Sequence, residues 1–324
     1  MTIYYKDVYL NNYSVVGGPY LNEGPLKEYL DETYKDFYDG EKTFEDCEIK
    51  ELNKSINILL NKVDKKKEDI DLILSSDLTN QLMISNYLVE KINIPYFGVY
   101  NACASLNEEL IIASLFKNKN IICTTSAHTL TSERQYRSPI EYGSPKPDYS
   151  TFTVSASTAC LVSNNKEGVR IESGTIGKVI DSGIKDSFDM GSAMAIAAVD
   201  TLHNHLVETN RGLDYYDLII SGDLGKYGEE IFKRYYYEKY KTKLNNYLDA
   251  GAYIYNKDDK RVYAGGSGPS CLPTYFYLKV FKKMKDKKIK RVLLLATGAL
   301  LSTTSVNQKK TIPSICHAVS LEAI

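Results

Sequence analysis

The stretch IPYFGVYNACASLNEELIIASLF, residues 94–116, decides how the rest of the chain is interpreted. A β-like run ends at Tyr100, and Cys103 follows shortly after it, where a helix has to begin. Ser105 and Glu108 have the spacing of a capping box, and the apolar residues after them recur at helical intervals. The stretch therefore predicts a strand, a turn that carries Cys103, and a largely buried helix.

Cys103 would face the positive end of that helix. A thiol at such a place can become nucleophilic, or the free N–H groups around it can hold a small anion. The alternative is a buried structural cysteine, a role open to the five other cysteines as well. The six cysteines have no CxxC or other zinc spacing, so the sequence predicts neither a metal site nor a disulfide framework.

The composition indicates a globular protein that works without an extensive basic surface. Hydrophobic residues make up 43% and charged residues 25% of the 324 positions, which is typical of soluble proteins. The net charge of −1 gives no reason to expect a nucleic-acid partner. The N-terminus has no apolar core of signal-peptide length, and no later apolar run is long enough to span a bilayer. We expect reduced cysteines, a cytoplasmic location, and contact with a membrane only through partners.

A short internal sequence repeat predicts the architecture. Residues 71–78 read DLILSSDL and residues 217–224 read DLIISGDL, which is identity at six of eight positions. A predicted helix precedes each copy, and helices and strands alternate after each in the same order. Alternation of this kind favours parallel βαβ units. An internal duplication explains the sequence repeat, and the alternative is a chance similarity of two apolar strands.

The sequence thus predicts an α/β protein with an N-terminal half at residues 1–165 and a C-terminal half at residues 166–324. The predicted strand at 151–162 consists of small residues. Asp189 is a candidate N-cap for the predicted helix that follows this aspartate. A polar, proline-bearing segment at 126–150 is too long for a plain turn and suggests a functional loop.

The four histidines differ in their promise as site residues. His203 and His205 are two positions apart on a predicted helix, so they cannot share a metal ion, and a half-exposed helix face explains them. His128 opens the polar loop directly after a strand, and His317 lies in a short apolar run near the C-terminus. Either of the last two could reach Cys103.

Arg134, Arg137 and Lys146 are the concentrated cations near the loop. Such charges are usually solvated, but beside an anion pocket they would matter. The run Gly265-Gly266-Ser267-Gly268 lacks the lysine of a P-loop and does not open a dinucleotide fold, so we expect no cofactor.

A duplicated βαβ architecture with a cysteine at the start of the third helix resembles the thiolase superfamily, which includes the ketoacyl-carrier-protein synthases. Within it, five ordered motifs are similar to the stage V sporulation protein AD family of spore-forming Firmicutes. The motifs are HTLTSERQYRSPIEYG (128–143), TFTVSASTACLVS (151–163), DMGSAMAIAA (189–198), LLLATGALLS (293–302) and ICHAVSLE (315–322).

This resemblance implies a thiolase-like fold with two duplicated halves packed as a layered α/β/α/β/α core. It also implies a role outside fatty-acid condensation: the family is linked to dipicolinic acid (pyridine-2,6-dicarboxylate), bound free or as its calcium chelate, and to its loading into the developing spore. The implied partners are the membrane proteins of the same operon, at the inner spore membrane, and a second copy of the chain, because thiolase-fold proteins generally pair through sheet edges.

The resemblance also allows the catalytic positions of the synthases to be compared with the residues of this sequence. Synthases of this type use a cysteine as acyl nucleophile, with a histidine and an asparagine that polarise the thioester. Cys103 stands at the nucleophile position, but the histidine position falls near Gly222 and the asparagine position at Gly266. We therefore expect a binding pocket without condensing activity. The alternative is a residual acyltransferase in which His128 or His317 assists Cys103.

For a flat dianion, the expected ligand-binding residues surround the turn before the helix. They are Cys103, Asn101, His128, Arg134, Arg137 and His317. The helix N-terminus would add N–H donors, worth on the order of 0.3–1 kcal/mol for a nearby anion.

Overall fold

The two copies of the repeated segment form equivalent strands of one protein. The computed structural model describes residues 1–134 and 146–324. Segment 71–78 forms β4 (Leu72–Ser76) and segment 217–224 forms β11 (Leu218–Ser221). A long helix precedes each strand, α1 (Phe44–Lys62) in the first half and α5 (Met190–Thr209) in the second.

The strand topology repeats in both halves. The first half has the order β5-β4-β6-β8-β2, and the second has β12-β11-β14-β15-β9. In each half the first two pairings are parallel and the next two are antiparallel. The bounds are β5 (Tyr96–Gly98), β6 (Ile121–Ala127), β8 (Ala156–Ser163), β2 (Tyr9–Gly17), β12 (Tyr247–Asp249), β14 (Arg291–Ala299), β15 (Pro313–Ala323) and β9 (Val169–Thr175). The identical strand topology of the two halves supports the interpretation of the sequence repeat as a duplication.

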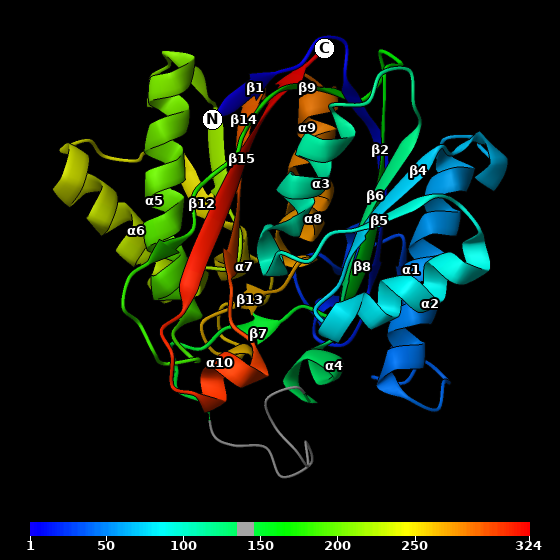
Figure 1. Ribbon diagram of the computed structural model, residues 1–324, viewed down its shortest axis with the longest axis horizontal. Coiled ribbons are helices and arrows are strands. Elements are labelled where there is room, and N and C mark those ends of the chain that lie inside the picture. Colours follow the sequence, from blue (N-terminus) through cyan, green and yellow to red (C-terminus); the bar gives the residue numbers. More distant parts are fainter. Residues whose placement is uncertain (135–145) are drawn as a thin grey trace.

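The halves stack into five layers, as Figure 1 shows. Helices α1 and α2 (Met83–Ile92) cover the outer face of the first set of strands, and α5 and α6 (Gly225–Tyr240) cover that of the second. Between the two sets lie α3 (Ser105–Ala113) and α8 (Cys271–Tyr275). The predicted layered α/β/α/β/α fold is therefore confirmed.

Helix α3 is buried on almost every side because it lies between two layers of strands. Seven of its nine residues are buried, including polar ones. Among these, Asn107 donates hydrogen bonds from Nδ2 to the carbonyl oxygens of Leu294 and His317, at 2.9 and 2.7 Å. The helix that follows Cys103 is thus bonded to strands of the other half.

The remaining elements are short and connect or extend these layers. They are β1 (Thr2–Tyr4), β3 (Glu32–Thr33), α4 (Thr129–Arg134), β7 (Phe152–Thr153), β10 (Ile180–Asp181), α7 (Ala250–Tyr253), β13 (Gly266–Ser267), a π-helical turn (Phe276–Phe281), α9 (Lys282–Lys285) and α10 (Thr303–Asn307). Strand β1 pairs with β9, so the N-terminus contributes to the second set of strands. The division at residue 165 remains an interpretation.

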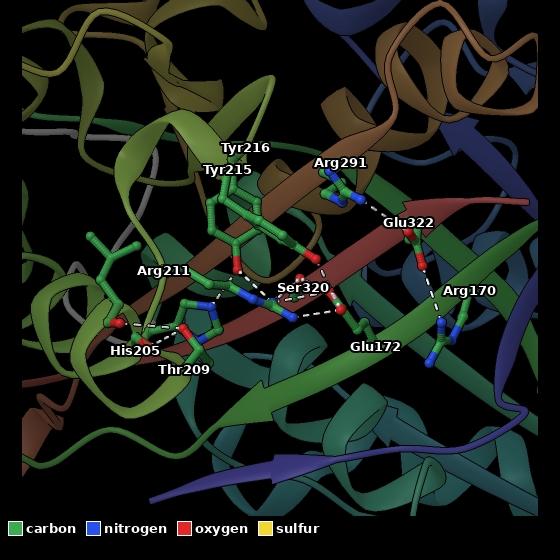
Figure 2. Close-up of polar contacts among 11 residues, drawn as sticks. Arg170, Glu172, His205, Thr209, Arg211, Tyr215, Tyr216, Arg291, Ser320 and Glu322 are labelled. Atoms are coloured by element: carbon green, nitrogen blue, oxygen red, sulfur yellow. Dashed lines mark hydrogen bonds and ion pairs between the residues drawn. The ribbon is translucent and has the colours of Figure 1, made fainter.

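A polar cluster fastens α5 to the second set of strands (Figure 2). The carboxylate of Glu172 on β9 accepts two hydrogen bonds from the Arg211 guanidinium, and Arg211 also donates to Tyr216 Oη at 3.2 Å. That hydroxyl lies 2.6 Å from Nε2 of His205, whose Nδ1 contacts Thr175 Oγ1 at 2.6 Å. His205 is fully buried, so the expectation of a half-exposed face was wrong for this residue.

Two local predictions near the central helix were wrong. Ser105 forms no capping box, because Ala102–Ala104 make a 3-10 turn and the Ser105 hydroxyl donates to the carbonyl oxygen of Ala102. The strand predicted at 151–162 is split, because its first part pairs with β13 as β7 and only the part from Ala156 enters the main sheet.

Helix starts were only partly predicted. The helix predicted before the first copy of the repeat is α1, which begins at Phe44, and Thr43 Oγ1 caps it by accepting a hydrogen bond from the Asp46 N–H. Asp189 does occupy the N-cap position of α5, but its side chain makes no capping hydrogen bond. Across the described residues, no helix is both long enough and apolar enough to cross a membrane.

Candidate functional site

A cavity of about 500 Å³ opens above Cys103. The turn after β5, the end of β14 and the β7–β13 pair build its wall, so both halves contribute to it. Ligand sites of α/β proteins commonly lie at the carboxyl ends of strands, as this one does. The lining includes an ion pair, Glu133 with Lys146, and a set of hydroxyl side chains. Those hydroxyls belong to Tyr100, Ser132, Ser150, Thr151, Thr153, Ser187, Ser267 and Ser302.

The turn that carries Cys103 is strained and tightly packed. Ala102 has a φ of 49°, which is unfavourable for a residue with a side chain. Beneath the turn, a Cβ atom at Gly298 of β14 would lie 2.8 Å from the Asn101 carbonyl oxygen. Glycine at this position of β14 therefore lets the turn approach the second set of strands and places Cys103 at the floor of the cavity.

The Cys103 thiol is not activated. Its side chain is half-buried, and burial together with the carboxyl group of Asp223 raises its pKa well above the usual range. The preceding turn and α3 would lower the pKa of a thiol at a helix start, but burial and the acidic neighbour outweigh that effect. The sulfur is a protonated thiol at neutral pH.

Asp223 is the neighbour that produces this effect. It is fully buried, and its φ is 78°. Within the described residues, neither carboxyl oxygen has a hydrogen bond of ordinary geometry. Burial and the nearby Asp249 raise the pKa of Asp223 well above its usual value.

The two positions assigned to the synthase histidine and asparagine are closed by packing. A Cβ atom at Gly222 would lie 2.6 Å from Leu272 Cβ. At Gly266 it would lie 2.5 Å from Ile254 Cγ2 and 2.8 Å from Val154 Cγ2. Neighbouring side chains occupy the space that polarising groups would need.

His128 lies away from the cavity wall, in a buried aromatic environment. Its Nε2 is 3.0 Å from the Phe37 carbonyl oxygen, and its Nδ1 accepts a hydrogen bond from the Leu130 N–H at 3.2 Å. The ring stacks against Phe44. Both ring nitrogens are engaged, so the geometry offers no free base for Cys103.

His317 and Asn101 are brought together by the fold. The Asn101 amide nitrogen lies 3.1 Å from His317 Nε2, and His317 Nδ1 accepts a hydrogen bond from the Gly177 N–H at 3.2 Å. Burial lowers the pKa of His317 to about 4, so the ring is neutral. Asn101 adjoins the Cys103 turn, but the cavity is lined by Ala102 and Cys103 rather than by this pair.

The predicted arginines contribute no described contact. Arg134 is the last residue of α4 and its side chain lies outside the description, as does the whole of Arg137. Of the cations noted around the loop, Lys146 lines the cavity and pairs with Glu133. In the described ranges, no three His, Cys, Asp or Glu side chains are placed to hold a metal ion.

Sequence reasoning missed Asp223 and Glu133 as neighbours of the site. Asp223 could have been found, because it occupies the seventh position of the second copy of the repeat, as Asp77 does in the first. Glu133 gave no local signal: its partner Lys146 is 13 residues away across the polar loop.

Comparisons with known proteins agree with this fold. The family model for stage V sporulation protein AD matches residues 2–322. Stage V sporulation protein AD of Bacillus subtilis (strain 168) is 40% identical over 324 residues, covering 99% of this chain and 96% of that protein.

Solved structures of condensing enzymes share the fold at low sequence identity. A variant of Xanthomonas campestris OleA superposes with a TM-score of 0.61 at 10% identity, covering 99% of this chain and 98% of the other. The 3-oxoacyl-[acyl-carrier-protein] synthase III of Aquifex aeolicus gives 0.53 at 13% identity, with 97% of each chain covered.

Proposed function

Because this chain belongs to the stage V sporulation protein AD family, and is thus a sporulation protein with a thiolase-like fold, we propose that its cavity binds dipicolinic acid. We further propose that this binding supports uptake of the compound into the developing spore. The ligand is a flat ring with two carboxylates, taken free or as its calcium chelate.

One observation carries the proposal. The cavity retains its floor at Cys103, while the positions for a polarising histidine and asparagine are filled by Leu272 and Ile254. On our proposal, such a site holds a ligand and lacks the groups that stabilise a condensation transition state. The cavity volume falls within the range of small-molecule sites, and its hydroxyls with Lys146 supply donors for carboxylates.

Isothermal calorimetry and thermal shift with millimolar dipicolinate test the proposal. We expect saturable binding, and much weaker binding of pyridine-3,5-dicarboxylate, which has the same charge but a different carboxylate geometry. Absence of both heat and thermal shift with dipicolinate would refute it. Repeating the titration with calcium distinguishes the free acid from the chelate.

Two pairs of variants locate the binding to the cavity. Cys103→Phe should reduce affinity at least tenfold by filling the floor, whereas Cys103→Ser should bind normally because no nucleophile is required. Lys146→Met should weaken binding, whereas Lys282→Met, an exposed lysine on α9, should not. Normal binding by Cys103→Phe would place the ligand elsewhere.

The edge strand β5 supports a proposal about assembly. It ends the strand order of the first half, and its Phe97 is 55% exposed. We propose that two chains pair along this edge and that the dimer works beside the membrane proteins of the same operon at the inner spore membrane. A Phe97→Glu variant that remains dimeric by light scattering would argue against this edge.

A further inference from the structure

The turn between α9 and β14, residues 283–290, is fixed by its own backbone. The N–H groups of Lys288 and Ile289 both donate to the carbonyl oxygen of Lys283, at 2.8 and 3.2 Å. Lys287 has a φ of 58°, a conformation typical of the residue that follows a helix C-terminus. These bonds satisfy the end of α9 and hold the turn in one shape.

Apolar side chains anchor the turn, and charged side chains face the solvent. Met284 is fully buried in the main core cluster, and Ile289 packs against the same cluster. The other six residues of the turn are exposed, and five of them are lysines. We call these five lysines the lysine turn; they are Lys283, Lys285, Lys287, Lys288 and Lys290. Because two buried residues hold the turn from inside, its lysines form a fixed surface feature of the folded protein.

The lysine turn concentrates positive charge on a chain that is otherwise acidic. Five lysines and one aspartate give residues 283–290 a formal charge of +4, whereas the whole chain carries −1, which leaves −5 for the rest. Among the described residues, one ion pair involves the turn, that of Lys288 with Asp286 at 3.5 Å, and an exposed pair of this kind is weak. Asp217 lies nearby and accepts the backbone N–H of Lys290 at 2.7 Å. This charge distribution attracts an anionic surface and orients the molecule on it.

A second lysine run lacks such an excess of charge. Residues 64–69 read DKKKED, so three lysines stand against three acidic residues. Asp69 also accepts a hydrogen bond from the Lys66 N–H at 2.8 Å. The positive excess at 283–290 is therefore not a general property of the lysine-rich turns of this chain, and the balanced run provides a matched control.

The lysine turn and the cavity lie at opposite ends of the molecule. Strand β14 begins at Arg291, directly after the turn, and its last residue, Ala299, lines the cavity. A strand of nine residues spans roughly 30 Å. Figure 1 shows the same separation, with α9 near the C-terminus and with β7, β13 and α10, which contribute lining residues, at the other end. A surface that binds the turn therefore does not cover the cavity.

We propose that the lysine turn docks the protein directly on a bilayer that contains anionic phospholipids, with the cavity on the side away from the bilayer. Clusters of roughly four to eight basic residues are typical of segments that bind such headgroups. Nucleic acid suits the turn less well, because residues 283–290 include no arginine for bidentate contacts and no aromatic ring for base stacking. The contact is additional to any partner protein and does not depend on which ligand the cavity holds.

Cosedimentation of the full-length protein with vesicles tests the proposal. We expect binding to vesicles of equal parts phosphatidylglycerol and phosphatidylcholine, weakened by added salt, and no binding to phosphatidylcholine alone. The variant Lys283→Gln/Lys285→Gln/Lys288→Gln should bind about a hundredfold more weakly, at about fivefold per lysine. The control Lys65→Gln/Lys66→Gln/Lys67→Gln removes the same number of lysines from the balanced run and should bind within about twofold of the wild type.

Three outcomes overturn the proposal. They are no binding of the wild type to the mixed vesicles at low salt, equal losses in the two triple variants, and tighter binding of duplex DNA that the first variant abolishes, which would assign the turn to nucleic acid. Thermal unfolding checks that the variants fold, and Lys285→Gln alone, expected to weaken binding about fivefold, replaces the first variant if it does not. Dipicolinate binding without vesicles should be unchanged in that variant, so failure of the proposed function and failure of this inference are distinguishable.

Discussion

Each copy of the repeat has an aspartate as its last residue but one, and the surroundings of these two aspartates are opposite. Asp77, after β4, accepts four hydrogen bonds from the backbone and hydroxyl groups of Thr79 and Ser85 and so holds the start of α2. Asp223, after β11, accepts none in the described structure, and α6 is capped by Asp249 from the neighbouring strand instead. The same residue at the same place in the repeat thus bonds the start of a helix in one half and makes no such bond in the described part of the other.

The largest difference in stability between paired variants should appear when each of the two aspartates is replaced by asparagine. Asp77→Asn leaves an amide NH₂ against N–H and hydroxyl donors, so we expect a loss of about 3 kcal/mol in the free energy of unfolding. Asp223→Asn should change it by less than about 1 kcal/mol, because no hydrogen bond is lost. Urea denaturation of both variants measures the difference, and equal losses would contradict the assignment of roles.

Acid sensitivity should arise in the second half. Burial lowers the pKa of His205 to about 4, below its usual 6.5. Between these values the unfolded chain takes up a proton that the folded chain does not, so stability is complete above about pH 6.5 and is lost as the pH falls toward 4. The loss is about 3 kcal/mol for such a group. Asp249, whose pKa burial raises to about 6, opposes it, because stability from this group falls as the pH rises through the same range.

Comparing His205→Gln with His203→Gln isolates the contribution of His205 to the pH dependence of stability. His203 lies two residues away on α5 and stacks on Tyr240. Denaturation at pH 4.5, 5.5 and 6.5 should show a weakened pH dependence in His205→Gln and an unchanged one in His203→Gln. A wild-type slope in His205→Gln would place the acid sensitivity elsewhere.

The position before each aspartate gives a third comparison. Ser76 in the first copy corresponds to Gly222 in the second, where a Cβ atom would meet Leu272. Gly222→Ser should cost about 2 kcal/mol by overpacking, and Leu272→Ala should remove most of that cost in the double variant. Purely additive losses in the double-mutant cycle would mean that Leu272 does not close the position.

The smallest effect concerns the helices before the two strands. Thr43→Ala removes a side-chain cap from α1 and should cost about 1 kcal/mol. Asp189→Ala at the same position of α5 should cost only a few tenths of a kcal/mol, because the Asp189 side chain makes no capping hydrogen bond. Thermal unfolding of the two variants is sufficient to rank them.

Much of the architecture was predictable from local patterns. The repeated segment, the alternation of helices and strands, and the apolar helix after Cys103 all survive in β4, β11 and α3, because burial in a layered fold imposes a readable pattern. The capping box at Ser105 failed for a physical reason: its hydroxyl can donate backward to a tight turn as readily as it can accept from the helix.

The site was predictable from the sequence only where its residues are neighbours along the chain. The Cys103 turn was found because a strand and a helix flank it in sequence. Glu133 reaches the cavity through contacts between distant segments, and no periodicity encodes which loop meets which. His128 looked suitable beside a strand end, yet its ring is held by Phe37 and Phe44.

The hydrogen bonds of Asn107 have an evolutionary consequence. The central helix belongs to the first copy by sequence, but it is bonded to Leu294 and His317 of the second. These bonds join the two copies, so separating them would remove the side-chain donor that the Leu294 and His317 carbonyl oxygens share. On the interpretation of the halves as a duplication, divergence at the rim, in loops and at the cavity leaves these bonds intact, whereas loss of a half would break them.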